Sequence, residues 1–230
     1  MPKATDVQSM FDRIAGRYDL LNALLSGGRD RAWRRALTRA VAARNPRTGL
    51  DLCCGTGAVA LELARGLEGG CRVVAADFSS RMCAAAAAKF SRSKFALSTC
   101  CADGLVLPFR AGQFDFVSVA FGVRNFEDLA RGLGEIARVL RPGGTVAILE
   151  FAPPEGRFLR ALYKPYLRIA VPAAGRLLSA DSGAYSYLSS SIQSFLPPAR
   201  ITASLHEAGF REPSAKKLTF GVTYLYTATR

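Results

Sequence analysis

The sequence predicts an α/β domain built on an open, mostly parallel sheet, and three observations support this fold class. Short apolar segments alternate along the chain with helical patterns, as they do in successive βαβ units. One of these segments leads into a glycine turn and then a helix, in the stretch LDLCCGTG at residues 50–57. The chain ends, at residues 213–230, in two predicted strands that meet near Gly221.

The length and composition predict one globular unit. At 230 residues the chain can bury a full core, and we expect a single domain over residues 1–230, with helices in 1–47 and a substrate-side insertion at about 152–196. Hydrophobic residues make up 50% and charged residues 21% of the chain, which excludes global disorder. No segment approaches the ~18 apolar residues of a membrane-spanning helix, and no signal-peptide core is present, so a cytoplasmic protein is expected.

The formal net charge of +13 predicts an anionic partner or surface, and both nucleic acid and the inner face of a membrane qualify. Seven arginines with almost no acids among them crowd residues 29–47, where both a solvated basic face and a binding surface are compatible with the pattern. A second basic stretch, Arg157–Arg168, is amphipathic and interrupted by Pro165. Such a stretch is typical of a membrane-surface or partner-binding segment, and an ordinary helix over the sheet is equally compatible with it.

The six cysteines lie between Cys53 and Cys101 and have neither CxxC spacing nor a histidine partner. This pattern predicts buried reduced thiols and no metal site. In the N-terminal part, Gly27 and Gly28 interrupt the helical pattern, and Asp30 is expected to cap the next helix.

The glycine turn after the first strand is formed by Gly55, Thr56 and Gly57. Glycine can take a positive φ and lets a ligand lie against the main chain, and the helix that follows adds free N–H groups. A dinucleotide site would have a third glycine where Ala60 stands, and the acidic Asp51 before the turn does not favour a pyrophosphate. The turn therefore favours an adenosine ligand that ends in an amino acid and carries no phosphate.

Acidic residues end or follow the next two predicted strands. The segment Arg72–Asp77 ends in a carboxylate about twenty residues after the glycines, where it can accept hydrogen bonds from ribose hydroxyls. Asp77 can alternatively belong to a helix cap, and Ser79 capping while Asp77 binds satisfies both interpretations. The third strand is expected at 95–101, with Asp103 directly after it.

The fourth predicted strand, Phe114–Phe121, runs into Gly122, Val123, Arg124 and Asn125. Ligands of open α/β sheets sit at the carboxyl ends of the strands, so Arg124 and Asn125 stand where chemistry is expected. The structural alternative is an ion pair from Arg124 to Glu127 or Asp128. Further along, a helix is expected over 127–140, a strand over 145–151 and a helix over 197–209.

This order of elements is that of the class I S-adenosylmethionine methyltransferases. The motifs that make the match more specific are YDLLNALLSGGRDRAWRR, FGVRN, RVLRPGGTVAILEF, ADSGAYSYLSSSI and LTFGVTYLYTA. Together they resemble the ubiquinone/menaquinone biosynthesis C-methyltransferase family over almost the whole chain. The resemblance implies a Rossmann-like, mostly parallel seven-stranded sheet with a C-terminal antiparallel strand, and S-adenosyl-L-methionine as cofactor. The chain departs from the family pattern at Cys53, Cys54, Ala58 and Ala120.

The resemblance also implies roles for individual residues. The cofactor site would comprise Gly55, Thr56, Gly57, Asp77, Asp103 and Gly104, with Asp77 on the ribose and Asp103 and Gly104 flanking the adenine. We expect Arg124 to act as a fixed cation beside an ionised ring hydroxyl while Asn125 orients the ring. Substrate-binding residues would be Tyr18, Asn22, Arg31, Trp33 and Tyr185.

The implied reaction is C-methylation of a polyprenylated quinol ring, most simply demethylmenaquinol to menaquinol. A methoxy-polyprenyl-benzoquinol stays open as the acceptor, as do the prenyl length, the proton acceptor and a homo-oligomeric state. The expected partners are a lipid quinol and an anionic membrane surface, with a peripheral place on its inner face. An RNA methyltransferase is the alternative from another class, but AFGVRN stands where an NPPY-like motif would be, so no nucleic-acid partner is expected.

Overall fold

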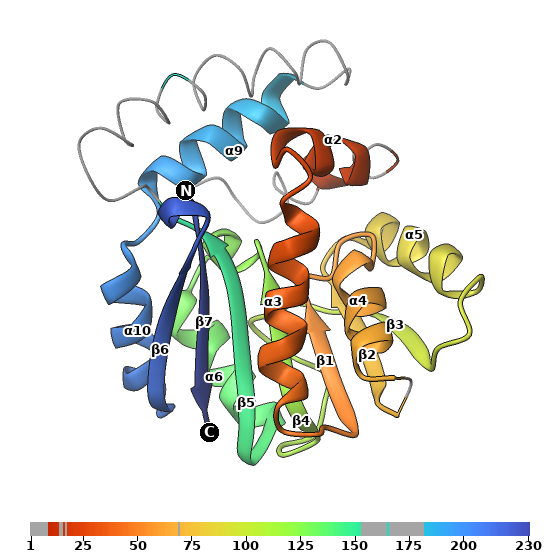
Figure 1. The fold of residues 1–230 in the computed structure, drawn as a ribbon, viewed down its shortest axis with the longest axis vertical. Coiled ribbons are helices and arrows are strands. Elements are labelled where there is room, and N and C mark those ends of the chain that lie inside the picture. The colour runs from red at the N-terminus through yellow and green to blue at the C-terminus, as the bar shows by residue number, and fades with distance from the viewer. Residues whose placement is uncertain (1–8, 14–15, 17, 69, 153–164, 166–181) are drawn as a thin grey trace.

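The computed structural model describes residues 9–13, 16, 18–68, 70–152, 165 and 182–230. A seven-stranded sheet in the order β3-β2-β1-β4-β5-β7-β6 runs through the middle of the molecule (Figure 1). The strands are β1 (Thr48–Leu52), β2 (Arg72–Asp77), β3 (Leu97–Cys101), β4 (Phe114–Ala120), β5 (Leu140–Phe151), β6 (Arg211–Leu218) and β7 (Thr223–Thr229). The predicted fold class is confirmed.

The five strands from β3 to β5 are parallel, and β7 is antiparallel to both of its neighbours, β5 and β6. The β6–β7 hairpin turns at η4 (Thr219–Gly221), as the sequence predicts. Strand β5 begins earlier than predicted, because Leu140 pairs with Phe114 before the register shifts across the RPGG segment. The ladder resumes where Thr145 pairs with Phe116.

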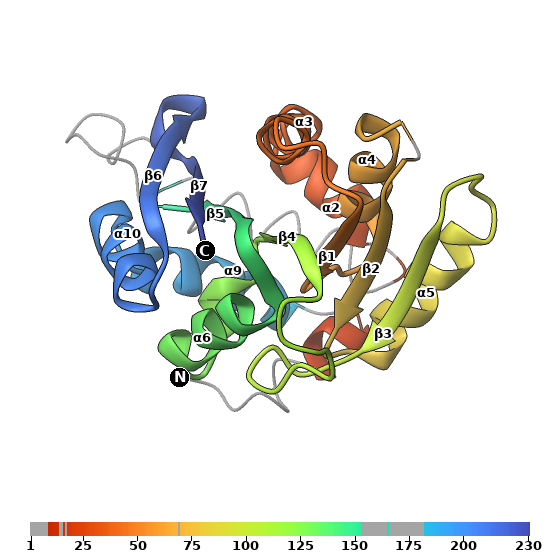
Figure 2. The ribbon, with the colours of Figure 1, turned by 90° about the horizontal axis from the view of Figure 1, so that it is seen from below.

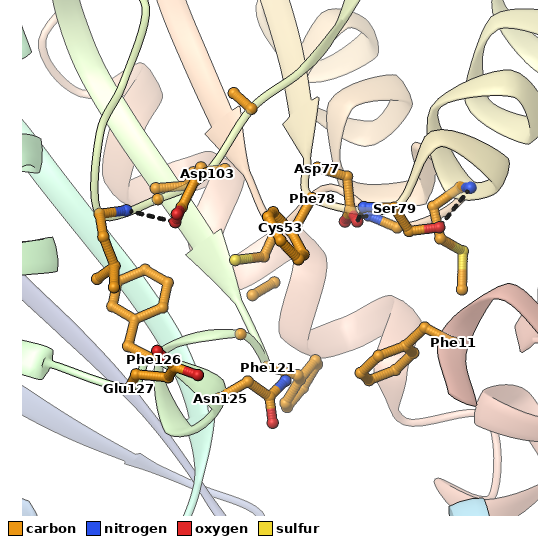
Figure 3. A pocket seen from close by; sticks show the side chains of 18 residues that line it. Phe11, Cys53, Asp77, Phe78, Ser79, Asp103, Phe121, Asn125, Phe126 and Glu127 are labelled. Atoms are coloured by element: carbon orange, nitrogen blue, oxygen red, sulfur yellow. Dashed lines mark hydrogen bonds between the residues drawn. The ribbon is translucent and has the colours of Figure 1, made fainter. Parts of the chain in front are cut away.

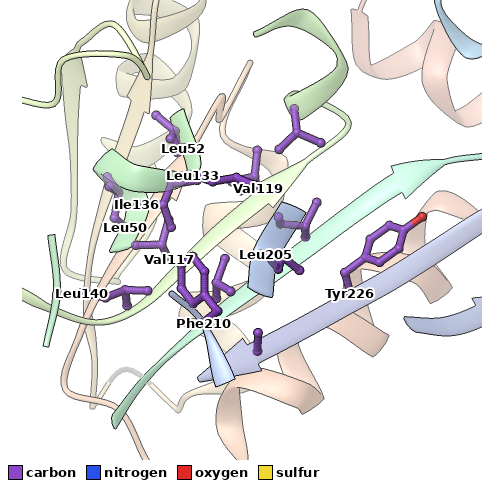
Figure 4. Close-up of a cluster of buried hydrophobic side chains, with 14 of the residues drawn as sticks. Leu50, Leu52, Val117, Val119, Leu133, Ile136, Leu140, Leu205, Phe210 and Tyr226 are labelled. Carbon is purple, nitrogen blue, oxygen red and sulfur yellow. The ribbon is translucent and has the colours of Figure 1, made fainter. Parts of the chain in front are cut away.

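Helices cover both faces of the sheet (Figures 1 and 2). On one face, α3 (Asp30–Ala42), α4 (Ala58–Gly66) and α5 (Ser80–Phe90) pack on a cluster that includes Leu37, Leu63 and Phe90. On the other face, α6 (Leu129–Val139) buries Leu133 and Ile136 against β5, and α10 (Pro198–Glu207) packs against β6 and β7 with Leu205 in the same apolar cluster (Figure 4). The central strands β1 and β4 are buried on both sides, which explains their nearly continuous apolar sequence, whereas the edge strand β3 is half-buried to exposed.

Two predicted helix caps have different outcomes. Ser79 is the N-cap of α5, and its side chain accepts a hydrogen bond from the N–H of Met82, as predicted. Asp30 is not a cap, because Gly27 and Gly28 take positive φ angles and bring the helix boundary to Arg29. The carboxylate of Asp30 instead accepts a hydrogen bond from Ser26 at 3.1 Å.

The carboxyl ends of the parallel strands meet at one edge of the sheet, and α2 (Tyr18–Leu25) and α9 (Ser182–Ser194) lie beyond that edge (Figure 1). Within the described part of the chain, no helix has the length and apolar character needed to cross a membrane. The basic stretch at 157–168 lies outside the described residues, apart from Pro165.

Candidate active site

A cleft opens at the carboxyl ends of β1, β2 and β4, with an empty volume of about 910 Å³ that includes its open mouth. Four of the six predicted cofactor residues line it: Gly55, Asp77, Asp103 and Gly104. Aromatic side chains also line it, and Phe11 and Phe126 lie on opposite sides of the space (Figure 3).

The turn after β1 packs tightly against α5. Gly55 and Gly57 both have positive φ angles, at 53° and 78°. A Cβ added to Gly57 would lie 2.5 Å from the ring of Phe90, so this position needs both the conformation and the small size of glycine. Gly57 therefore holds the turn against α5, and it does not line the cleft.

Asp77 connects two backbone groups at the end of β2. One carboxylate oxygen accepts the N–H of Gly55 at 2.8 Å, and the other accepts the N–H of Ser79 at 2.9 Å. Burial raises the pKa of Asp77, and these two N–H groups act in the opposite direction. A carboxylate can accept about four hydrogen bonds, so capacity remains for a ribose on the cleft side.

Asp103 and Gly104 form the wall that follows β3. Asp103 is exposed, and its carboxylate accepts the N–H of Leu105 at 2.9 Å, which fixes the loop. A Cβ on Gly104 would lie 3.1 Å from the ring of Phe126, so the two residues pack closely. The ring of Phe126 can pack against the face of an adenine base here, and the carboxylate of Asp103 is the polar group beside it.

Thr56 is placed differently from the other predicted cofactor residues. It is buried, it does not line the cleft, and its hydroxyl lies 2.5 Å from the carboxylate of Asp19 in α2. The ammonium group of Lys89 lies 2.6 Å from the same carboxylate and 3.1 Å from Thr56. The contacts of Thr56 therefore connect the glycine turn to α2 and α5.

Arg124 is also placed differently from the prediction. Its Nη1 lies 2.7 Å from Oε1 of Glu150 and 2.6 Å from the carbonyl oxygen of Phe121. The guanidinium group lies 5.7 Å from the centre of the Phe151 ring. Arg124 is buried and absent from the cleft lining, and its ion pair is with Glu150, not with Glu127 or Asp128. The guanidinium charge is therefore paired with Glu150, and the expected role of Arg124 as a cation beside the substrate stays a prediction.

Asn125 lies in the cleft, as predicted from its place after β4. Its Oδ1 accepts a hydrogen bond from the hydroxyl of Tyr187 in α9 at 2.9 Å. Burial raises the pKa of Tyr187, while Arg124 lowers it and Glu150 raises it again. Tyr187 stands two positions after the predicted Tyr185, and its hydrogen bond to a residue 62 positions away has no signal in the sequence.

The predicted substrate residues are not gathered in the described lining of the cleft. Trp33 is buried in the core, where its Nε1 donates to Thr219 at 2.8 Å and its ring lies 5.9 Å from the rings of both Phe121 and Phe151. These contacts are structural. Arg31 is exposed on α3 and Asn22 is half-buried on α2. Tyr18 begins α2 and Tyr185 belongs to α9, but their side chains lie outside the described part.

A second buried acid lies beneath the glycine turn. Asp51 is 1% exposed, and its Oδ1 accepts a hydrogen bond from the hydroxyl of Ser118 at 2.7 Å. Its Oδ2 has no hydrogen-bond partner in the part of the chain that the structure describes. Burial raises the pKa of Asp51 to about 7, with Asp77 adding to the shift and the Ser118 hydrogen bond opposing it. The sequence had shown this acid only as an argument against a pyrophosphate.

The cysteines are all free. Cys54, Cys71 and Cys83 are buried, but Cys53 and Cys100 are half-buried and Cys101 is exposed, so the expectation of uniformly buried thiols is wrong. Burial raises the pKa of the Cys53 thiol well above its usual range, which keeps it protonated beside the cleft. Over the described residues, no cluster of metal-ligating side chains is present.

Solved structures with the same architecture are methyltransferases or relatives of them in fold. The chain superposes with a TM-score of 0.65 on human N-acetylserotonin methyltransferase in complex with S-adenosylmethionine, at 21% identity, covering 93% of this chain and 55% of that one. It superposes with a TM-score of 0.71 on the [4+2]-cyclase SpnF, at 18% identity, covering 100% and 97% of the two chains. At these identities the likeness concerns the fold alone.

The strand order, the glycine turn after β1 and the carboxylate at the end of β2 define a class I S-adenosylmethionine-dependent methyltransferase. The chain belongs to the ubiE/COQ5 methyltransferase family, whose model matches residues 1–230. It is 42% identical over 221 residues to the demethylmenaquinone methyltransferase of Thermus thermophilus, covering 96% of this chain and 100% of that protein. The demethylmenaquinone methyltransferase of Deinococcus radiodurans is 39% identical over 99% of this chain and 94% of its own.

A relative with a broader name is the ubiquinone/menaquinone biosynthesis C-methyltransferase UbiE of Geobacter sulfurreducens, 38% identical over 99% of this chain and 90% of that protein. The cofactor of this family of enzymes is S-adenosylmethionine, and the cleft fits it. Asp77 has acceptor capacity toward the cleft, Phe126 forms an apolar wall, and the backbone of Gly55 allows a close approach.

Proposed function

We propose that this chain transfers the methyl group of S-adenosylmethionine to a ring carbon of demethylmenaquinol and so forms menaquinol. The observation that carries the proposal is the full-length similarity to relatives named demethylmenaquinone methyltransferase, at 42%, 39% and 40% identity. The cleft supports it, because an aromatic acceptor ring can be held near the cofactor. Aromatic side chains and the amide group of Asn125 line the same space as Asp77, the carboxylate proposed to bind the cofactor.

When bound, S-adenosylmethionine supplies an electrophilic methyl group on a positively charged sulfur. The protein's part is to hold the ring carbon in line with the carbon–sulfur bond and to favour the ionised form of a neighbouring ring hydroxyl. A phenolic hydroxyl has a pKa of about 10 in water, so a hydrogen-bond donor beside its oxygen raises the fraction ionised at neutral pH. Among the described residues that line the cleft, Asn125 has the side chain that can donate from nitrogen.

A benzoquinol is the second acceptor that a specific observation favours, because the Geobacter sulfurreducens relative is named for both quinone pathways. The two rings differ in one fused ring, so the width of the cleft decides between them. The demethylated naphthoquinol remains the better acceptor in this proposal, since the names of the Thermus, Deinococcus and Mycolicibacterium relatives specify it alone.

We infer that the lipid acceptor is reached at an anionic membrane surface on the cytoplasmic side. Each CH₂ of a prenyl tail exposed to water costs about 0.8 kcal/mol, so the enzyme is expected to come to the bilayer. The net charge of +13 favours anionic lipids. Phe220 is 72% exposed at the β6–β7 turn, next to the end of β5, and Arg31 and Lys216 are exposed as well.

The experiment is an acceptor competition with radiolabelled S-adenosylmethionine. The purified protein is incubated with demethylmenaquinol, the demethylated benzoquinol and total RNA together, each at the same concentration, and the products are separated before counting. We expect label mainly in menaquinol. Label mainly in the benzoquinol would replace the acceptor, and label in RNA would replace the proposed function. A parallel incubation with the quinones kept oxidised controls for the need for a quinol, since an oxidised ring has no hydroxyl to ionise.

A further inference from the structure

The contact that carries a further inference joins α9 to the end of β4. The hydroxyl of Tyr187 donates to Oδ1 of Asn125 at 2.9 Å, and Asn125 lines the cleft. Tyr187 itself is half-buried and does not line the cleft. Its contact with the reaction space therefore passes through the amide of Asn125.

This hydrogen bond sets the orientation of the amide. An asparagine side chain carries an acceptor at one end and a donor at the other, and a phenolic hydroxyl that donates selects the oxygen. The nitrogen end then points the other way, and within the described residues it has no hydrogen-bond partner. In Figure 3 the nitrogen lies on the side of Phe121 and the oxygen on the opposite side.

The surroundings keep Tyr187 in the donating state. Burial raises the pKa of its hydroxyl, and the opposing influence of Arg124 is countered by Glu150, to which Arg124 is paired. A protonated hydroxyl can donate to Oδ1, whereas a phenolate would attract the nitrogen end and turn the amide over. The ion pair also fixes the turn, because the N–H of Arg124 lies 3.4 Å from Oε2 of Glu150.

We propose that Tyr187 is a positioning residue that holds the Asn125 amide with its nitrogen toward the acceptor, so that Asn125 donates a hydrogen bond to the ring oxygen that loses its proton. The inference rests on the proposed function, because it needs an acceptor with an ionisable ring hydroxyl. The proton of that hydroxyl passes to solvent, and the developing negative charge on oxygen is stabilised by the amide N–H. Neither side chain takes up a proton.

The test is a double-mutant cycle on kcat for methyl transfer to demethylmenaquinol. Asn125→Ala removes a donor to a developing anion and is expected to lower kcat by about a hundredfold. Tyr187→Phe leaves the amide in place but unoriented, and is expected to lower kcat by between about two- and tenfold. In the Asn125→Ala background, Tyr187→Phe is expected to cost nothing further, since the amide through which it acts is gone.

Two further readouts separate positioning from a general structural role. With Tyr187→Phe, the pH at which kcat reaches half its maximum is expected to rise, because the ring hydroxyl is harder to ionise without a fixed donor. Calorimetric affinity for S-adenosylhomocysteine and the melting temperature are expected to stay at wild-type values. Ser194→Ala, which removes an exposed hydroxyl bonded to the backbone of the same helix, is the matched control and should leave kcat and the pH profile unchanged.

The outcomes are distinct. If the wild-type protein methylates no quinol, the proposed function fails and this inference fails with it. If the wild type is active and the effects of the two substitutions add fully, Tyr187 does not act through Asn125 and the inference is overturned. An unchanged pH profile in Tyr187→Phe would overturn it as well.

Discussion

Nη1 of Arg124 lies 2.7 Å from Oε1 of Glu150, and the two side chains are only 4% and 0% exposed. The same carboxylate oxygen accepts the N–H of Phe151 at 2.8 Å, so the pair joins the end of β5 to the turn that carries Asn125. A buried pair of opposite charges presents little net field to the neighbouring cleft. The contacts of Arg124 and Glu150 therefore hold this turn in place.

The first prediction follows from the burial of this pair. Arg124→Gln leaves Glu150 buried without its cation, and is expected to lower the free energy of unfolding by about 3–5 kcal/mol at neutral pH, as measured by urea denaturation. Arg124→Gln combined with Glu150→Gln removes both charges and should recover most of that loss. A single Arg124→Gln variant as stable as the wild type would contradict the assigned role.

The second prediction concerns cofactor binding. Asp77→Ala removes the carboxylate proposed to bind the ribose and also the acceptor for the N–H groups of Gly55 and Ser79. Hydrogen bonds to a charged group contribute about 1.5–3 kcal/mol, so S-adenosylhomocysteine should bind roughly ten- to a hundredfold more weakly in calorimetry. Glu207→Gln, an exposed carboxylate on α10, is the control. Unchanged affinity in Asp77→Ala would exclude Asp77 from the site.

The third prediction is a pH dependence of stability. The pKa of Asp51 is raised from 3.8 to about 7 in the folded protein, so between these values the folded state holds a proton that the unfolded state has lost. The contribution of Asp51 to stability is therefore full below about pH 4, falls as the pH rises to about 7, and is constant above that, with a total change of up to about 4 kcal/mol.

Asp51→Asn keeps the shape of the side chain and removes this titration. The difference in unfolding free energy between Asp51→Asn and the wild type should move in favour of the variant as the pH is raised from about 4 to about 7. Urea denaturation at several pH values measures it, and the difference cancels the titration of Glu150, whose pKa is also raised by burial. Asp77 interacts with Asp51, so the pair Asp77→Asn and Asp77→Asn with Asp51→Asn is compared in the same way. A difference that stays constant with pH would show that Asp51 is ionised throughout.

The fourth prediction concerns the membrane surface. The wild-type protein should bind vesicles of anionic lipid in a salt-sensitive manner and bind neutral vesicles weakly. Phe220→Asn should weaken the binding to anionic vesicles by about tenfold, because an aromatic side chain is lost from the interface. Asparagine tolerates the positive φ of 57° at this position. Val106→Ser, at another exposed apolar residue, is the control, and equal losses in both variants would argue against a contact through the β6–β7 turn.

Much of the fold and part of the site follow from local patterns in the sequence. The strand Arg72–Asp77, the Ser79 cap and the glycine turn each depend on neighbouring residues, and the sequence predicts them correctly. Asp77 and Gly55 come together because the parallel pairing of β1 and β2 brings their carboxyl ends to one edge. The sequence alone shows that an acid ends one predicted strand and that a glycine follows the strand before it.

The partners of buried polar groups are not visible in this way. Glu150 stands 26 positions after Arg124, inside a strand that reads as apolar, and only the register of β4 against β5 brings the two together. Trp33 has a large aromatic side chain of the kind that often contacts ligands, but it packs against Phe121 and Phe151 in the core. Tyr187 lies in the stretch predicted as an insertion, outside the repeating βα pattern of the sequence, so no periodicity predicts its distance from Asn125.

The most direct test of the proposed C-methylation is the position of the transferred methyl group. The protein is incubated with demethylmenaquinol and S-adenosylmethionine that carries a deuterated methyl group, and the product is analysed by mass spectrometry and proton NMR. We expect the deuterated methyl group on a ring carbon, with both ring hydroxyls free and the ring proton at that carbon lost. A product with the label on oxygen, or recovery of all the label as unreacted cofactor while the positive-control enzyme of a relative is active, would contradict it.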